Sequence, residues 1–385
     1  MNMKKMIAAA AVAASAIVAN AASVTIDSVV QRWPWNNKVD ITYTVTDGQT
    51  LASDGGGVFY RLVFNYDIGG VTGTIDGVHD IGASANTGTH TITWTPPADL
   101  KLKSSNCTMT ATLYRADDPS GDDYMIVNLD TGVVSYEGLL YSQELSNERY
   151  NIDKYKKFLL PLRKIQKGTY FTSAGNMTTD KDYYIALFQL TGYQYLCIYY
   201  GAEMSESGYA GRSDGCNPRL LKYNNDMRGS ADPTVVPVGN ANGKTIPRLN
   251  AKTGLTFDIP TALMHEIATR AGTTTTYFWG NDAGLGSQYA VCSGVSGITA
   301  VGSMKPNNWG LYDMVGLKWQ WCLDVANGTR DPDDYVFTPA TGDNANRVVR
   351  GCANGDPAAS MKSNYSSMLH SSNSSCASRL AYIVK

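Results

Sequence analysis

Seven cysteines and four histidines carry most of the metal-binding and nucleophilic chemistry that this sequence offers. No two cysteines form a CxxC pair, and the histidines are scattered along the chain, so the spacing of a structural zinc site is absent. An odd number of cysteines leaves at least one thiol unpaired even where disulfides form. The cysteines are Cys107, Cys197, Cys216, Cys292, Cys322, Cys352 and Cys376, and the histidines are His79, His90, His265 and His370.

The segment from Gly310 to Cys322 combines side chains that could bind an ion or a ligand. Tryptophans, glycines and oxygen-bearing side chains follow one another there with neither a helical nor a strand period, so we expect a shaped loop. Trp319 and Trp321 within it, and Trp309 just before it, offer large apolar surfaces with one N–H group each. Such residues suit either a core or a ligand groove.

The charge of the chain excludes some partners. The formal net charge is -2 and no run of five like charges occurs, so we expect neither nucleic acid nor an acidic membrane surface as a partner.

Residues 1–21 have the pattern of a secretory signal peptide. A basic start at Lys4 and Lys5 precedes an Ala-rich apolar stretch, and Ala19-Asn20-Ala21 fits a cleavage site after Ala21. The alternative is a membrane anchor, but the stretch is shorter than the roughly 20 apolar residues that span a bilayer. We therefore expect a secreted, periplasmic or cell-surface protein with no membrane insertion after cleavage, in a compartment where disulfides persist.

Residues 22–128 are predicted to form an all-β domain of the immunoglobulin-like sandwich type. Apolar residues alternate along three segments, and Gly, Asp and Pro clusters separate them. Trp33 and Trp35 suit a core or interdomain contact better than a binding patch. Residues 129–154 are polar and lack a steady period, which indicates a linker. The alternating positions are Val39, Ile41, Tyr43 and Val45, then Val58, Tyr60, Leu62, Phe64 and Tyr66, then Cys107, Met109, Ala111 and Leu113.

Residues 155–385 contain no phosphate-binding glycine loop, which excludes the common nucleotide-binding folds. One helix is clearly predicted. Pro260 precedes Thr261, which is placed to cap a helix that runs to Arg270 and ends at Gly272.

The order of motifs in this second part resembles the formylglycine-generating enzyme family, also called sulfatase-modifying factor domains. The longest agreement runs through Thr253–Thr261, Glu266–Thr274 and Tyr277–Gly280. Further matches are Leu162–Tyr170, Tyr183–Ile185, Gln189–Thr191, Gln194-Tyr195, Val301–Ser303, Pro306-Asn307, Gly310–Cys322, Arg347–Gly351 and Arg379–Ala381.

The resemblance implies an irregular α+β fold of the C-type-lectin-like kind. It also implies oxidation of a sulfatase cysteine to formylglycine by oxygen and a copper ion that two cysteines hold, because copper(I) prefers sulfur. Here the sequence departs from the family. The segment usually written Cys-Arg-Ser-Ala-Tyr-Arg is Met361-Lys362-Ser363-Asn364-Tyr365-Ser366, and no cysteine lies between Cys352 and Cys376. We therefore do not expect copper, and Cys352, Cys376 and Met361 are only weak catalytic candidates.

A disulfide is the more economical use of Cys352 and Cys376. A bridge from Cys322 to Cys352 competes with it, and Cys197 with Cys216 would close a local loop. The sequence leaves these alternatives open.

The resemblance further implies a calcium site in the Gly310–Cys322 segment. Asp313 and Gln320 would supply side-chain oxygens, and Gly316 and Lys318 would supply backbone carbonyls. The alternative is that Asp313 caps a turn and Gln320 binds a buried backbone group. Arg350 and Arg379 are expected to pair with carboxylates such as Asp324, with ligand binding as the second interpretation.

Two functions follow as expectations. The first is a secreted, catalytically inactive recognition module for a protein, peptide or glycan, with a groove between the 309–324 and 352–376 loops. The second is a formylglycine-generating oxidase with a rearranged metal site.

Overall fold

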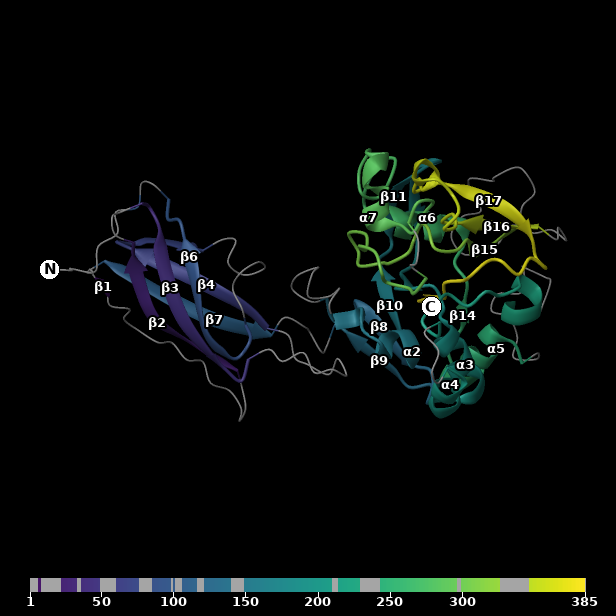
Figure 1. Ribbon diagram of the computed structural model, residues 1–385, viewed down its shortest axis with the longest axis horizontal. Helices are drawn as coiled ribbons and strands as arrows, with labels where there is room; N and C mark the ends of the chain where they lie inside the picture. The colour runs from purple at the N-terminus through teal and green to yellow at the C-terminus, as the bar shows by residue number, and fades with distance from the viewer. Residues whose placement is uncertain are drawn as a thin grey trace. The chain divides into compact units, whose positions relative to one another are not determined.

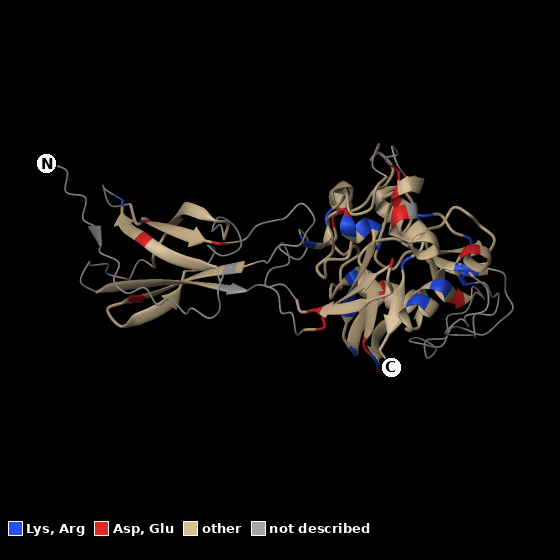
Figure 2. Ribbon diagram, turned by 90° about the horizontal axis from the view of Figure 1, so that it is seen from below, with Lys and Arg blue, Asp and Glu red and all other residues tan. Residues whose placement is uncertain are grey.

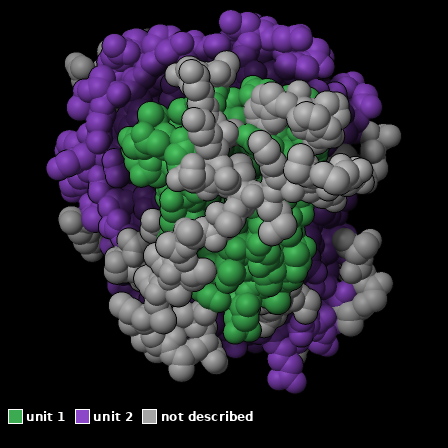
Figure 3. Space-filling view, turned by 90° about the vertical axis from the view of Figure 1, so that its left-hand side faces the viewer, with its two compact units in different colours: residues 1–118, 140–146 green, residues 119–139, 147–385 purple. Residues whose placement is uncertain are grey.

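A computed structural model describes most of the chain. The described residues are 6–7, 22–32, 36–48, 60–75, 85–97, 100, 106–115, 121–139, 149–209, 214–228, 243–295, 299–325 and 346–384. Most of the predicted signal peptide, and Trp33 and Trp35, lie outside them. The chain divides into two compact units, residues 1–118 with 140–146, and residues 119–139 with 147–385 (Figure 3).

The N-terminal unit is built from strands alone in its described part (Figure 1). One sheet has the order β1-β2-β3-β6 and the other the order β5-β4-β7, with antiparallel pairing throughout. The strands are β1 (Met6–Ile7), β2 (Ser23–Gln31), β3 (Val39–Thr46), β4 (Tyr60–Ile68), β5 (Val71–Thr74), β6 (Gly88–Trp94) and β7 (Cys107–Arg115).

A single apolar cluster draws residues from both of these sheets. On β3 the side chains alternate between buried and half-buried, as the period-2 pattern predicts, and Tyr43 contacts Phe64 of β4 edge to face at 5.2 Å between ring centroids. The predicted strands are thus confirmed over their described residues, whereas Val58 lies outside them.

The C-terminal unit is rich in short sheets. A six-stranded sheet has the order β14-β18-β13-β10-β8-β9, a hairpin pairs β11 with β12, and a third sheet has the order β15-β16-β17. The strands are β8 (Tyr124–Asn128), β9 (Val134–Glu137), β10 (Leu159–Ile165), β11 (Gly168–Thr172), β12 (Gly175–Thr179), β13 (Tyr183–Ala186), β14 (Phe257–Asp258), β15 (Gln320–Val325), β16 (Asn346–Arg350), β17 (Ser366–His370) and β18 (Ala381–Ile383).

Short helices complete this unit (Figure 1). The predicted helix is confirmed as α6, whose Thr261 hydroxyl accepts the Met264 N–H at 3.1 Å, and Ala271 ends it in the left-handed conformation. The helices are α2 (Lys154–Lys157), α3 (Gly192–Tyr200), α4 (Ala202–Gly208), the π-helix η1 (Tyr223–Arg228), α5 (Thr245–Thr253), α6 (Ala262–Arg270), α7 (Gly286–Tyr289) and the 3₁₀ turns η3 (Ala283–Leu285) and η4 (Ala358–Ser360).

The predicted domain boundary at residue 128 and the linker 129–154 need correction. β8 belongs to the C-terminal unit, where it pairs with β10 and β9. Within the supposed linker, Tyr150 is fully buried and donates a hydrogen bond to Glu137 at 2.6 Å. The sequence could not reveal this, because the partner strand of β8 begins about thirty residues later and a buried strand has no alternation to assign it to a sheet.

Charges are distributed differently over the two units (Figure 2). The described strands of the N-terminal unit carry few charged residues, whereas acidic and basic residues are interspersed over the C-terminal unit. Among the described residues, none of the helices has the length and apolar character needed to cross a membrane.

Candidate functional site

The predicted loop Gly310–Cys322 is confirmed only in part: residues 310–319 have no regular secondary structure, but Gln320, Trp321 and Cys322 begin β15. Most of the loop is buried, and tight backbone contacts shape it. Gly316 has a φ of +82°, and a Cβ there would lie 2.7 Å from the Val291 carbonyl oxygen, so only glycine fits. Asp313 and Leu317 also adopt left-handed φ angles, of 52° and 63°.

Two glutamine amides hold the backbone of this loop. The Gln189 Nε2 lies 3.2 Å from the Asp313 carbonyl, 3.4 Å from that of Gly316 and 3.2 Å from that of Lys318. The Gln320 Nε2 lies 3.0 Å from the Asp313 carbonyl. The structure therefore brings together the residues expected to bind calcium, but their backbone carbonyls accept hydrogen bonds from the amide nitrogens of Gln189 and Gln320.

The Asp313 carboxylate lies beside a different segment. Its Oδ2 accepts the Gly302 N–H at 2.7 Å. Burial raises the pKa of Asp313, and the Gly302 hydrogen bond and the charge of Arg379 oppose this rise. Asp313 thus fastens the loop to residue 302, which is the turn-capping role named as the alternative to calcium.

Both candidate arginines are buried in the structure. The Arg350 guanidinium pairs with Glu266 at 3.0 Å, not with Asp324, whose carboxylate accepts the Ala262 N–H. Arg379 donates to the Gln320 Oε1 at 3.1 Å and to the carbonyls of Ala186 and Tyr312. The ion-pairing expectation is correct for Arg350 with a different partner, and Arg379 instead joins backbone carbonyls.

The three tryptophans lie in different surroundings. Trp321 is fully buried and donates its indole N–H to the Leu221 carbonyl at 2.7 Å. Trp309 is half-buried against Tyr170, at 5.8 Å between ring centroids. Trp319 contacts Tyr365 at 5.7 Å between ring centroids, so it connects the two loops that were expected to flank a groove.

The structure does not contain the expected disulfides. All seven cysteines are described, and none of them forms a disulfide. Cys352 and Cys376 even belong to separate apolar clusters, and the Cys352 thiol donates to the Ser360 carbonyl at 3.1 Å. Sequence spacing could not reveal this, because connectivity depends on tertiary distance.

The residues present do not fit the family's copper ion. Met361 stands at the expected cysteine position and is fully buried in a small cluster with Cys352, Cys292 and Phe278. Burial raises the pKa of Cys352, and it raises that of Cys376 to about 12. The two thiols also belong to separate apolar clusters, so they do not converge as the cysteine pair that copper requires.

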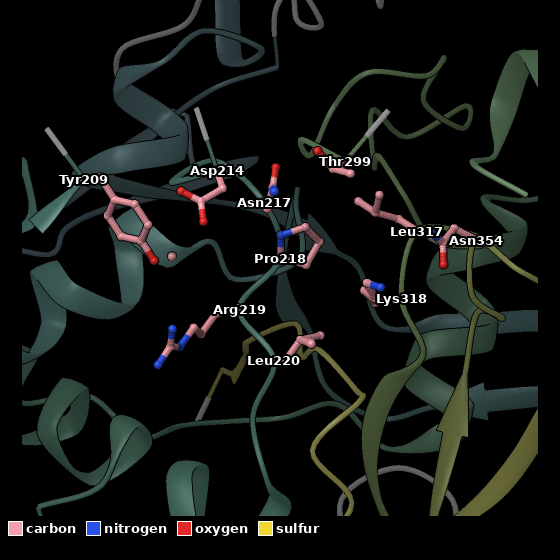
Figure 4. Close-up of a pocket in the computed structure, with 11 residues that line it drawn as sticks. Tyr209, Asp214, Asn217, Pro218, Arg219, Leu220, Thr299, Leu317, Lys318 and Asn354 are labelled. Atoms are coloured by element: carbon pink, nitrogen blue, oxygen red, sulfur yellow. The ribbon is translucent and has the colours of Figure 1, made fainter. Parts of the chain in front are cut away.

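A pocket of about 340 Å³ opens beside the 310–319 loop (Figure 4). Figure 4 shows Tyr209 and Asp214 on one side and Thr299, Leu317 and Asn354 on the other. Its further lining residues are Gly192, Asn217, Pro218, Arg219, Leu220 and Lys318. The pocket thus combines Lys318 of the 309–324 loop and Asn354 of the 352–376 loop with a third segment, residues 214–220, that the sequence did not single out.

Two polar groups of the pocket residues have no partner in the described part of the chain. Within the described part of the chain, the Lys318 ammonium has no hydrogen-bond or ion-pair partner, and the buried Asn217 Oδ1 has no hydrogen-bond partner. The Arg219 guanidinium lies over the Tyr195 ring at 4.5 Å and forms no ion pair among the described residues. No motif marks Asn217 or Arg219, so only the fold could identify them. Gln189 begins the matched Gln189–Thr191 segment, but the sequence did not predict its contacts with the loop.

Comparison with known proteins agrees with the motif order. The family model described as "Sulfatase-modifying factor enzyme 1-like domain" matches residues 142–378. No curated protein matches the chain at a significant level.

Several solved structures are similar to the chain. Treponema denticola variable protein 1 is 18% identical with a TM-score of 0.42 over 58% of this chain and 95% of its own. PvdO from Pseudomonas aeruginosa is 19% identical, with a TM-score of 0.42 over 58% and 95%. CarF is 16% identical, with a TM-score of 0.37 over 59% and 99%. These low scores carry no argument about function.

The family match covers more than half of the chain and the segment in which the motifs lie. The chain therefore belongs to the sulfatase-modifying factor, or formylglycine-generating enzyme, family.

Proposed function

We propose that this protein is a secreted recognition module that retains the family scaffold without the family's copper-dependent oxidation. The observation that carries the proposal is Met361, which stands where a copper-binding cysteine is expected and is fully buried in an apolar cluster. A thioether cannot ionise, so it does not replace a thiolate pair.

The pocket beside the 309–324 loop is the proposed ligand site. Two cations, Lys318 and Arg219, line it against a single carboxylate, Asp214, and amide and hydroxyl groups supply further hydrogen bonds. Trp319, which follows the lining residue Lys318 in the sequence, contacts Tyr365 at 5.7 Å between ring centroids. This chemistry suits a peptide or glycan that bears a carboxylate group.

Oxidation is tested directly. The mature chain, incubated with a CxPxR peptide, copper and a reductant, should leave the peptide thiol unchanged. Appearance of formylglycine would refute the proposal and support the alternative, an oxidase with a rearranged metal site.

Binding is tested with immobilised protein and a panel of oligosaccharides that differ only in carrying uronate carboxylates or neutral sugars, alongside a peptide panel with free or amidated C-termini. Replacing Lys318 with Ala should weaken retention of the acidic member by about tenfold, since one charge-assisted hydrogen bond contributes roughly 1.5 kcal/mol. Lys181, exposed and outside the pocket lining, provides the matched Lys→Ala control. Equal retention of both variants would refute the pocket assignment.

We also propose that residues 1–21 are removed on secretion and that the N-terminal β unit, as an immunoglobulin-like sandwich, spaces or docks the family domain. Its two sheets with a common apolar cluster support this proposal. An intact Met1 in protein recovered from a periplasmic fraction, measured by mass spectrometry, would refute cleavage.

A further inference from the structure

The calcium site that the family resemblance implies is made of four groups in the loop, and each of them is engaged by another part of this chain. The Gly316 and Lys318 carbonyls face the Gln189 amide nitrogen. The Asp313 carboxylate accepts the Gly302 N–H. Hydrogen-bond donors therefore converge on the oxygens that a cation would need.

The orientation of the Gln320 side chain follows from its neighbour. The Arg379 guanidinium donates to Gln320 Oε1 at 3.1 Å, and a guanidinium cannot accept a hydrogen bond. The amide oxygen must face Arg379, so the nitrogen faces the Asp313 carbonyl at 3.0 Å and the Met314 carbonyl at 3.3 Å. Gln320 thus presents N–H groups, not an oxygen, to the loop.

The charges around the loop also disfavour a bound calcium ion. Calcium takes oxygen ligands, and a higher count of carboxylates raises its affinity. Here the only other candidate side chain besides Asp313, Gln320, is a neutral amide, and the buried Arg379 places its positive charge beside the Gln320 oxygen. A divalent cation beside that guanidinium would meet repulsion in a poorly solvated environment.

We infer that the amide groups of Gln189 and Gln320 take the place of a calcium ion in this loop, so that the loop holds its shape independently of calcium. Gln189 lies in the segment between β13 and α3 and its amide contacts three carbonyls of the loop, and Gln320, the first residue of β15, contacts the Asp313 and Met314 carbonyls.

Gln189 is thereby a positioning residue for the pocket. Its amide holds the Lys318 carbonyl, and Leu317 and Lys318 form part of the pocket wall. This inference goes beyond the proposed function and does not depend on it, since a calcium-independent loop can be measured without any ligand.

The experiment uses the full chain. Elemental analysis of the purified wild type should find no stoichiometric calcium, and its melting midpoint should be the same in excess EDTA and in excess calcium. Stoichiometric calcium, or a midpoint that calcium raises, would overturn the inference.

A variant with a carboxylate in place of the Gln189 amide should make the stability of the loop depend on calcium. Gln189→Glu directs a carboxylate at three carbonyls, so its melting midpoint in EDTA should fall by roughly 5–10 °C and calcium should restore most of the loss. Gln288→Glu adds the same charge at an exposed site outside the loop and should respond to neither reagent.

A second variant covers the case in which Gln189→Glu does not fold. Gln189→Met keeps the length of the side chain and removes both N–H donors, so its midpoint should fall and calcium should not restore it. If calcium stabilised Gln189→Met as it does Gln189→Glu, the cation would bind without the introduced carboxylate, and the substitution by amides would be disproved.

Discussion

Neutralising Glu266 by Gln should destabilise the C-terminal unit more than any exposed charge change. Glu266 lies on α6 with 1% of its surface exposed, and its two oxygens are both occupied. One accepts the Ser173 N–H at 2.6 Å and the Arg270 guanidinium at 3.1 Å. The other accepts the Ser173 hydroxyl and the Arg350 guanidinium, each at 3.0 Å.

The magnitude follows from this arrangement. Removing one partner of a buried ion pair leaves the other charge uncompensated and costs about 3–5 kcal/mol. In a unit of this size, 1 kcal/mol lowers the melting midpoint by roughly 2–4 °C, so Glu266→Gln should lower it by about 6–20 °C. The amide also turns an N–H group toward at least one guanidinium, which adds repulsion.

The effect should depend on pH. Burial alone would raise the pKa of Glu266, but the charge of Arg350, the Ser173 hydrogen bond and Arg270 outweigh it and lower the pKa below 4.5. The unfolded state therefore binds the proton more readily. The stabilisation is fully present above pH 4.5 and is lost as the pH falls through the lower folded value, so wild type and variant should converge in acid.

The assay is urea unfolding of wild type and variant, followed by tryptophan fluorescence at several pH values; four of the seven tryptophans, at positions 279, 309, 319 and 321, belong to the C-terminal unit. Glu206→Gln, on an exposed position of α4, is the matched control. A double-mutant cycle with Arg350→Met should give a coupling above about 1 kcal/mol. If Glu266→Gln resembled the control, or if the two changes were additive, the ion-pair reasoning would be refuted.

Two further predictions concern other buried groups. Burial, with the charges of Arg350 and Arg379, lowers the pKa of His265 from 6.5 to about 3. On acidification the unfolded state therefore takes up a proton before the folded state does, and the free energy of unfolding should fall as the pH drops from 6.5 toward 3. The urea midpoint of His265→Gln should vary less over this range than that of the exposed control His370→Gln. Without reductant, all seven thiols should react with maleimide after denaturation, and in the native protein half-buried Cys216 should react first; fewer than seven labels by mass spectrometry would indicate a disulfide.

The sequence alone determined the elements whose cause is local. Alternation along β3 identified a half-buried strand, and Pro260 with Thr261 identified the start of α6, because backbone geometry and capping act within a few residues. The order of motifs identified the family, and the cysteine replaced by Met361 is visible without coordinates.

Tertiary structure alone decided which groups meet. β8 joined the C-terminal unit, Arg350 found Glu266 on α6, and Gln189 reached the loop from more than a hundred residues away. The pocket likewise combines residues 192, 209, 214 and 217–220 with 299, 317–318 and 354. Long-range partners are chosen by burial and by the need to satisfy every buried donor, acceptor and charge, and neither depends on spacing along the chain.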